Sequence, residues 1–199
     1  MTTNVSKGSR TVALFLVGAA AFALAGCGEE EVDATAFPDL ESCKEAANTG
    51  GTFSSLDCDS AFAAAQQLLV ETAPRYDSLE VCEEQHGEGA CGGESQVAGS
   101  SSGGGIFMPL LAGYLIGNMM SRGATASPAV QPLYKTADGR FTNATGSSTY
   151  NSNNGTGKLG ASQFSKQPAT IGKAPMTKAS VAARGGFGGS ATGRSSTGG

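Results

Sequence analysis

IFMPLLAGYLIGNMM, residues 106–120, is an apolar stretch without a single charged side chain. Glycine or proline recurs every four residues from Gly105 to Gly117, which would place small or flat residues along one stripe of a helix. Gly113 and Gly117 form a GxxxG pattern, which lets two helix backbones approach closely. The stretch predicts a short, apolar, glycine-zipper-like helix over residues 106–120, with Gly113 and Gly117 as its association site.

The environment of this predicted helix stays open. At about 1.5 Å per residue it would be about 22 Å long, shorter than the ~30 Å hydrocarbon core of a bilayer. A buried or self-associating helix is the favoured interpretation. A helix lying in the membrane interface comes second, and a transmembrane or pore-lining segment third.

The regions on either side of the apolar stretch differ in charge. Residues 27–105 contain sixteen Asp or Glu and two Lys or Arg, whereas residues 106–199 contain nine Lys or Arg and one acidic residue. This division predicts either that the two halves contact each other or that one of them meets an oppositely charged surface. A Ser/Gly linker over residues 93–105 separates the apolar stretch from the acidic region.

Residues 39–92 contain an even number of cysteines and a weak internal repeat. LESCKE (40–45) and LEVCEE (79–84) are each followed by glycine and then by a second cysteine. Four cysteines in an exported chain indicate two disulfides, with three connectivities. The repeat favours Cys43–Cys58 and Cys82–Cys91. The C-x14-C and C-x8-C spacings with one histidine match no common zinc site, so we expect no metal and no cofactor.

The same region predicts three short helices. Asp39 caps the first, Asp59 the second and Asp77 the third, while Pro74 stops the second and Gly87 the third. Large apolar side chains are few, and a unit of this size rarely stabilises itself by burial alone. The predicted fold is therefore a small, mainly α, disulfide-stapled helical domain over residues 39–92.

Residues 121–199 are rich in Gly, Ser, Thr, Asn and Ala, with basic residues spread singly. Such a composition buries little apolar surface, so we expect a long, largely disordered basic tail. The exception is a predicted hairpin over residues 133–142 with a glycine in its turn. This hairpin could dock on the acidic unit, the predicted helical domain over residues 39–92. The tail would attract anionic lipid or an envelope polymer. Nucleic acid is not an expected partner, because a single RGG element at Arg184 on an exported chain is weak support.

The amino terminus has the three parts of an export signal. A polar start with Lys7 and Arg10 precedes an apolar run over residues 12–25, and LAGC (24–27) resembles a bacterial lipobox. We expect residues 1–26 to be a lipoprotein signal peptide, Cys27 to be acylated, and residues 27–38 to form an acidic tether. The protein would then lie on the periplasmic side of the envelope. Gly28 in place of aspartate favours the outer membrane by lipoprotein sorting rules.

Four motifs resemble one protein family. They are TAPRY (72–76), GEGAC (87–91), MPLLAGY (108–114) and RGGFG (184–188), and they occur in the same order in the YgiB-like bacterial proteins, domain of unknown function 1190. The resemblance implies an uncharacterised envelope lipoprotein. It also implies a link, through neighbouring genes, to enzymes similar to glutathionylspermidine synthase. It carries over no catalytic residue.

The residue types argue against an enzyme. His86 is the only histidine, and the chain contains no HExxH motif and no GxxxxGK[ST] phosphate-binding loop. The function expected from the sequence is a non-enzymatic envelope lipoprotein that acts through binding or as an accessory protein. The alternative is a membrane-active oligomer that assembles through the GxxxG helix.

Overall fold

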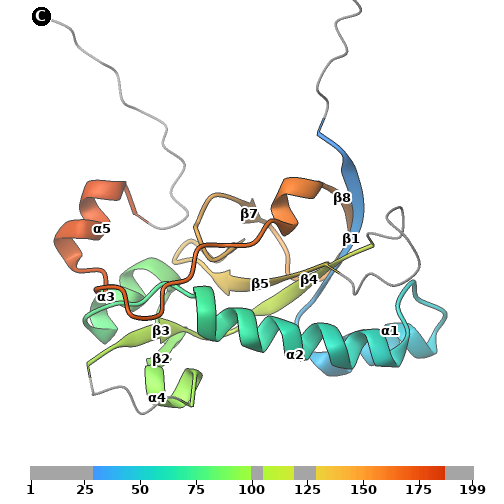
Figure 1. The fold of residues 1–199 in the computed structure, drawn as a ribbon, viewed down its shortest axis with the longest axis horizontal. Helices are drawn as coiled ribbons and strands as arrows, with labels where there is room; N and C mark the ends of the chain where they lie inside the picture. Colours follow the sequence, from blue (N-terminus) through green and yellow to red (C-terminus); the bar gives the residue numbers. More distant parts are fainter. Residues whose placement is uncertain (1–28, 100–104, 119–128, 187–199) are drawn as a thin grey trace, which may run out of the picture.

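The chain has a mixed α/β fold, not the mainly α fold that its sequence predicts (Figure 1). The computed structural model describes residues 29–99, 105–118 and 129–186. In chain order, its elements are β1 (Glu31–Phe37), α1 (Leu40–Asn48), α2 (Ser55–Thr72), α3 (Leu79–His86), β2 (Cys91–Gly93), α4 (Glu94–Val97), β3 (Phe107–Pro109), β4 (Gly113–Gly117), β5 (Ala129–Lys135), β6 (Phe141–Thr142), β7 (Thr149–Tyr150), β8 (Gly155–Gly160), the 3-10 helix η2 (Ala161–Phe164) and α5 (Lys178–Arg184).

A six-stranded antiparallel sheet organises the molecule, with the strand order β7-β6-β5-β4-β1-β8. β4 lies inside this sheet, where Ala36 of β1 faces Leu115 and Gln131 of β5 faces it from the other side. β2 and β3 form a separate two-stranded ladder in which Cys91 faces Pro109. Strands close in space therefore come from both charge halves of the chain.

The helix predicted over residues 106–120 is wrong. Its residues form β3 and β4, and residues 119–120 lie outside the described part of the chain. All five residues of β4 are buried, and a strand buried on both faces reads as a continuous apolar run. Periodicity alone cannot separate such a run from a buried helix. The alternative function, an oligomer that assembles through a GxxxG helix, is therefore not supported, because Gly113 and Gly117 lie in a strand.

The two glycines of this motif serve the sheet. Gly113 has a φ of +143°, and a Cβ there would lie 2.8 Å from the carbonyl oxygen of Phe37. A Cβ on Gly117 would lie 2.8 to 3.0 Å from the ring of Phe164. Glycine is therefore required because neighbouring strands and the segment after β8 approach the backbone closely.

Two further expectations about the chain ends are wrong. β1 lies within the region predicted to be an acidic tether, and its polar and apolar residues alternate between exposed and buried positions. The basic region is not a largely disordered tail, because it supplies β5 to β8 and α5. The hairpin over residues 133–142 is confirmed, since Tyr134 pairs with Thr142 and Lys135 with Phe141. Its turn docks on the acidic unit through the amide of Ala137, which donates to the carbonyl of Gln85 at 3.0 Å.

The three helices of the acidic region are present, with shifted starts. α1 begins after Asp39, whose side chain accepts from the amide of Ser42 as predicted. α2 is capped by Ser54 instead of Asp59 and so begins five residues earlier than expected, because Ser54 and Asp57 form a capping box. α3 is capped by Ser78 instead of Asp77. Among the described residues, no helix has the length and apolar character needed to cross a membrane.

The disulfides are Cys43–Cys58 and Cys82–Cys91, the connectivity that the internal repeat favours. The first joins α1 to α2 and is almost completely buried. It lies in the core between these helices and the sheet, with Phe37, Tyr114 and Ile116. The other face of the sheet packs Leu115 and Leu133 against residues from β7, β8 and η2. Helices α1 and α2 thus cover one face of the sheet, whereas η2 and side chains of β7 and β8 pack on the other.

Exposed ion pairs also join the two halves. Lys158 of β8 lies 3.2 Å from Asp33 of β1, and Lys178 of α5 lies 2.5 Å from Glu84 of α3. Such surface pairs contribute little to stability, because water and salt screen them. The charge division therefore reflects contact between the halves, but sheet pairing and burial provide most of the stabilisation.

We predict that Gly113→Ala destabilises the fold by about 1–3 kcal/mol, because alanine disfavours this φ and its methyl group would collide with the Phe37 carbonyl. Urea unfolding followed by circular dichroism measures the change. Gly157→Ala on the edge strand β8 is the matched control, since no atom lies within 4 Å of the added Cβ. Equal stability of the two variants would contradict this role for Gly113.

Replacing Cys43 and Cys58 together by alanine should lower the free energy of unfolding by about 3 kcal/mol, because their bond closes a loop with a sequence separation of 15. The Cys82–Cys91 loop has a separation of 9, so its removal should cost slightly less. Chemical denaturation under oxidising conditions tests both double variants. An unchanged midpoint would show that the bond does not form in the protein.

A basic pocket at the end of helix α2

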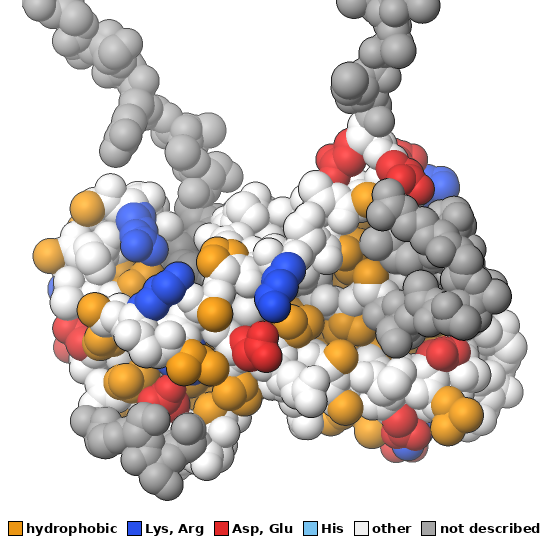
Figure 2. Space-filling model, viewed as in Figure 1, with side chains coloured by type: hydrophobic (Ala, Val, Ile, Leu, Met, Phe, Trp, Pro, Cys, Tyr) orange, Lys and Arg blue, Asp and Glu red, His pale blue; other side chains and the backbone are white. Residues whose placement is uncertain are grey.

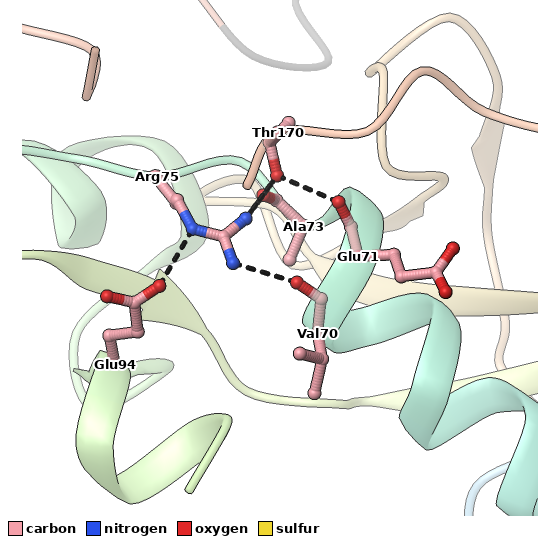
Figure 3. A network of polar contacts seen from close by, with 6 residues as sticks. All are labelled: Val70, Glu71, Ala73, Arg75, Glu94 and Thr170. Carbon is pink, nitrogen blue, oxygen red and sulfur yellow. Dashed lines mark hydrogen bonds and ion pairs between the residues drawn. The ribbon is translucent and has the colours of Figure 1, made fainter. Parts of the chain in front are cut away.

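Arg75 follows the C-terminal end of α2 and is 5% exposed. Pro74 cannot continue a helix, so the chain turns here and leaves helix carbonyls without intrahelical partners. The Arg75 guanidinium fills this role, since its Nη2 donates to the carbonyl of Val70 at 2.8 Å and its Nη1 reaches that of Ala73 at 3.4 Å (Figure 3). The side chain thereby folds back over the helix from which it emerges.

The charge of Arg75 is paired inside the protein. Its Nε donates to Oε1 of Glu94, the first residue of α4, at 2.9 Å, and both side chains are more than nine-tenths buried. Glu94 Oε2 is also buried and has no hydrogen-bond partner among the described residues. Removing one partner from a buried pair is strongly destabilising, because the other charge is left uncompensated. The pair therefore fixes α4 relative to the end of α2.

Thr170 brings the basic half of the chain into the same network. Its backbone amide donates to the carbonyl of Glu71 at 2.8 Å, and its hydroxyl donates to that of Ala73 at 2.7 Å while accepting from Arg75 Nη1. Met176 ties down the far end of this segment, since its amide donates to the Arg75 carbonyl at 2.7 Å. Residues 170–176 are thus held at both ends against the chain around Arg75.

A pocket of about 240 Å³ lies between this segment, the end of α2 and α5. Its cations are Arg75, Lys173 and Arg184, and no Asp or Glu is among the residues that line it. Lys173 and Arg184 lie within 4 Å of no carboxylate oxygen in the described part of the chain. Figure 2 shows Lys and Arg side chains gathered on the face that carries α5 and the segment leading into it. The pocket therefore carries a net positive charge.

His86 lies in a separate buried cluster with Tyr76 and Tyr134. Its Nδ1 lies 2.7 Å from the carbonyl of Lys135 and so donates to it, which leaves Nε2 to accept from the Tyr76 hydroxyl at 2.8 Å. Burial lowers the pKa of His86 to about 4 and raises the pKa values of both tyrosines. The imidazole is neutral at pH 7 and is completely buried, which suits a structural role better than proton transfer to a bound substrate.

The site residues expected from the sequence do not lie together in the part of the chain that the structure describes. Cys27 and the lipobox lie outside the described residues. The four other cysteines are paired, and Gly113 and Gly117 lie in β4 instead of in an association helix. In the parts of the chain that the structure describes, no group of three or more His, Cys, Asp or Glu side chains could hold a metal ion.

Sequence reasoning missed the Arg75 network. A visible signal existed in TAPRY, where an arginine stands between proline and tyrosine, two residues that favour burial or chain reversal. Nothing in the sequence could connect Arg75 with Thr170, which lies 95 residues further along the chain. The pocket depends on that long-range contact.

Comparisons with known proteins identify a family and several relatives. Residues 31–198 match the family described as "Protein of unknown function (DUF1190)". The UPF0441 proteins of Yersinia pestis bv. Antiqua and of Yersinia pseudotuberculosis serotype I are each 30% identical over 206 residues, covering 94% of this chain and 84% of theirs. No solved structure matches the chain.

We predict that acid destabilises the fold through His86. The folded-state pKa of about 4 lies below the ordinary 6.5, so the stabilising effect is complete above pH 6.5 and is lost as the pH falls toward 4. The total loss should be about 3 kcal/mol. Urea unfolding at pH 7, 6 and 5 should show about 2 kcal/mol of this loss, because the remainder occurs as the pH falls from 5 toward 4.

His86→Gln is the control, because this variant should lose most of the pH dependence between 7 and 5. The capping carboxyls of Asp39 and Asp57 have lowered pKa values and titrate below this window. A wild-type stability that stays level from pH 7 to 5 would show that His86 is not held in its neutral form.

Proposed function

The chain belongs to the DUF1190 family of proteins of unknown function, and we propose that it is a lipid-anchored envelope protein that acts by binding and not by catalysis. The observation that carries this proposal is the use of its five cysteines. Two disulfides consume four of them, which leaves only Cys27 of the lipobox outside these bonds. Disulfides persist in oxidising compartments, and such a compartment is where a bacterial lipoprotein resides.

The distance between Cys27 and the folded domain supports an anchoring role. β1 begins at Glu31, four positions after the lipobox cysteine, so only three residues separate Cys27 from the first strand of the sheet. A chain of this length reaches at most about 14 Å. Acylation of Cys27 would therefore hold the domain next to the membrane, with about 0.8 kcal/mol contributed by each buried methylene. Gly28 favours the outer membrane as its destination.

The described side chains support binding more than catalysis. His86 has both ring nitrogens engaged and is completely buried, so it cannot reach a substrate at the surface. The basic pocket beside Arg75 is open to solvent and is rich in hydrogen-bond donors. A positively charged pocket held next to a membrane suits an accessory protein that recruits or presents an anionic partner.

The anchor is tested by fatty-acid labelling and intact-mass measurement of the chain expressed in a bacterial host. We expect a mature protein that begins at Cys27 and carries acyl chains, in the membrane fraction. Cys27→Ser should abolish the label, whereas Cys43→Ser, which removes another cysteine, should keep it. An unlabelled chain in the cytosol, with residues 1–26 intact and its other cysteines reduced, would overturn the proposal.

A further inference from the structure

We propose that the pocket formed by Arg75, Lys173 and Arg184 binds the phosphate group of a small phosphate ester, either soluble or in a lipid headgroup. The inference rests on the proposed binding role, because it names the ligand class of that pocket, but it does not require the lipid anchor. Three cations line the pocket; Glu94 offsets the charge of Arg75, whereas Lys173 and Arg184 have no carboxylate partner among the described residues. Two uncompensated positive charges at the mouth of one cavity favour the binding of an anion.

Two of the pocket's cations have donors that no carboxylate of the described residues engages. Arg75 has most of its donors engaged by Glu94, Val70 and Thr170, so it forms part of the pocket wall and leaves ligand binding to the other two cations. Lys173 is bonded to no described side chain, and Arg184 makes only a weak 3.6 Å contact from Nη1 to the sulfur of Met176. These two exposed side chains are therefore free to converge on an anion that enters the pocket.

The hydroxyl groups of the pocket do not compete with this role. Thr72 donates its proton to the carbonyl of Leu68 at 2.7 Å, Thr145 donates to Oδ1 of Asn143 at 3.2 Å, and Thr170 donates its proton to the carbonyl of Ala73. The ligand must therefore satisfy ammonium and guanidinium donors, which a tetrahedral oxyanion with several acceptor oxygens does well. The volume of about 240 Å³ and the apolar side chains of Pro74 and Pro168 leave room for one small group, such as glycerol, beside the phosphate.

The backbone holds this pocket in shape before a ligand arrives. Thr170 and Met176 bind the chain near Arg75 at the two ends of the segment that carries Lys173. Arg184 belongs to α5, whose Lys178 is paired with Glu84 on α3. Both ligating cations thus project from segments that are tied to the acidic half, which reduces the ordering entropy lost on binding.

The test uses the full chain in a mild detergent, with glycerol 3-phosphate as the soluble probe and glycerol at equal ionic strength as the neutral control. Titration calorimetry should detect glycerol 3-phosphate and not glycerol. The double variant Lys173→Gln, Arg184→Gln should bind at least about tenfold more weakly, the loss of roughly one charge-assisted interaction. The control Lys158→Gln, Lys166→Gln removes the same charge outside the pocket and should bind like the wild type.

A second arm measures the Cys27→Ser chain on phosphatidylglycerol and phosphatidylcholine vesicles, comparing the same two double variants. Pocket-dependent preference for phosphatidylglycerol alone assigns the site to a lipid headgroup, and pocket-dependent binding of glycerol 3-phosphate alone assigns it to a soluble ester. Equal binding by both double variants, or no binding of either probe by a wild-type chain whose unfolding transition is intact, would overturn the inference. Such a failure would leave acylation of Cys27 untouched, and absence of acylation would leave pocket binding measurable.

Discussion

The buried guanidinium of Arg75 connects parts of the chain that would otherwise have little reason to meet. One charge satisfies carbonyls at the end of α2, pairs with Glu94 at the start of α4 and binds the hydroxyl of Thr170. An arginine buried this deeply is tolerable only when its donors are satisfied, so each of these partners must be in place in the folded state. The same interactions place Lys173 beside Arg184 and thus create the positively charged pocket.

The sheet imposes a second constraint, which explains why the acidic and basic halves are inseparable. β1 comes from the acidic half, but both of its sheet neighbours, β4 and β8, come from the basic half. Neither half contains a complete set of sheet neighbours, so neither can satisfy its strand backbone groups alone. A shortened chain that ends before residue 106 would lack five of the six strands, which is why the boundary suggested by composition and charge is not a structural one.

The sequence predicts local features well and long-range pairing poorly. Asp39, Pro74 and Gly87 delimit helices because capping and helix termination depend on neighbours within a few residues. β1 could have been found from the alternation in EVDATAF, residues 31–37, which the acidic character of the region obscured. β8 could not, because GTGKLG is mostly exposed and becomes a strand only through pairing with β1. The contact between Arg75 and Thr170 could not be predicted either, because it joins residues 95 positions apart in the sequence.

The most direct measurement is backbone hydrogen exchange at Thr170 and Met176, whose amides donate to Glu71 and Arg75. Arg75→Met keeps an unbranched side chain but removes the guanidinium that holds this segment. We expect faster exchange at both amides, while Leu115 and Ile116 in the central strand β4 stay protected. Unchanged protection at Thr170 and Met176 in a folded Arg75→Met protein would show that Arg75 does not hold the basic half in place.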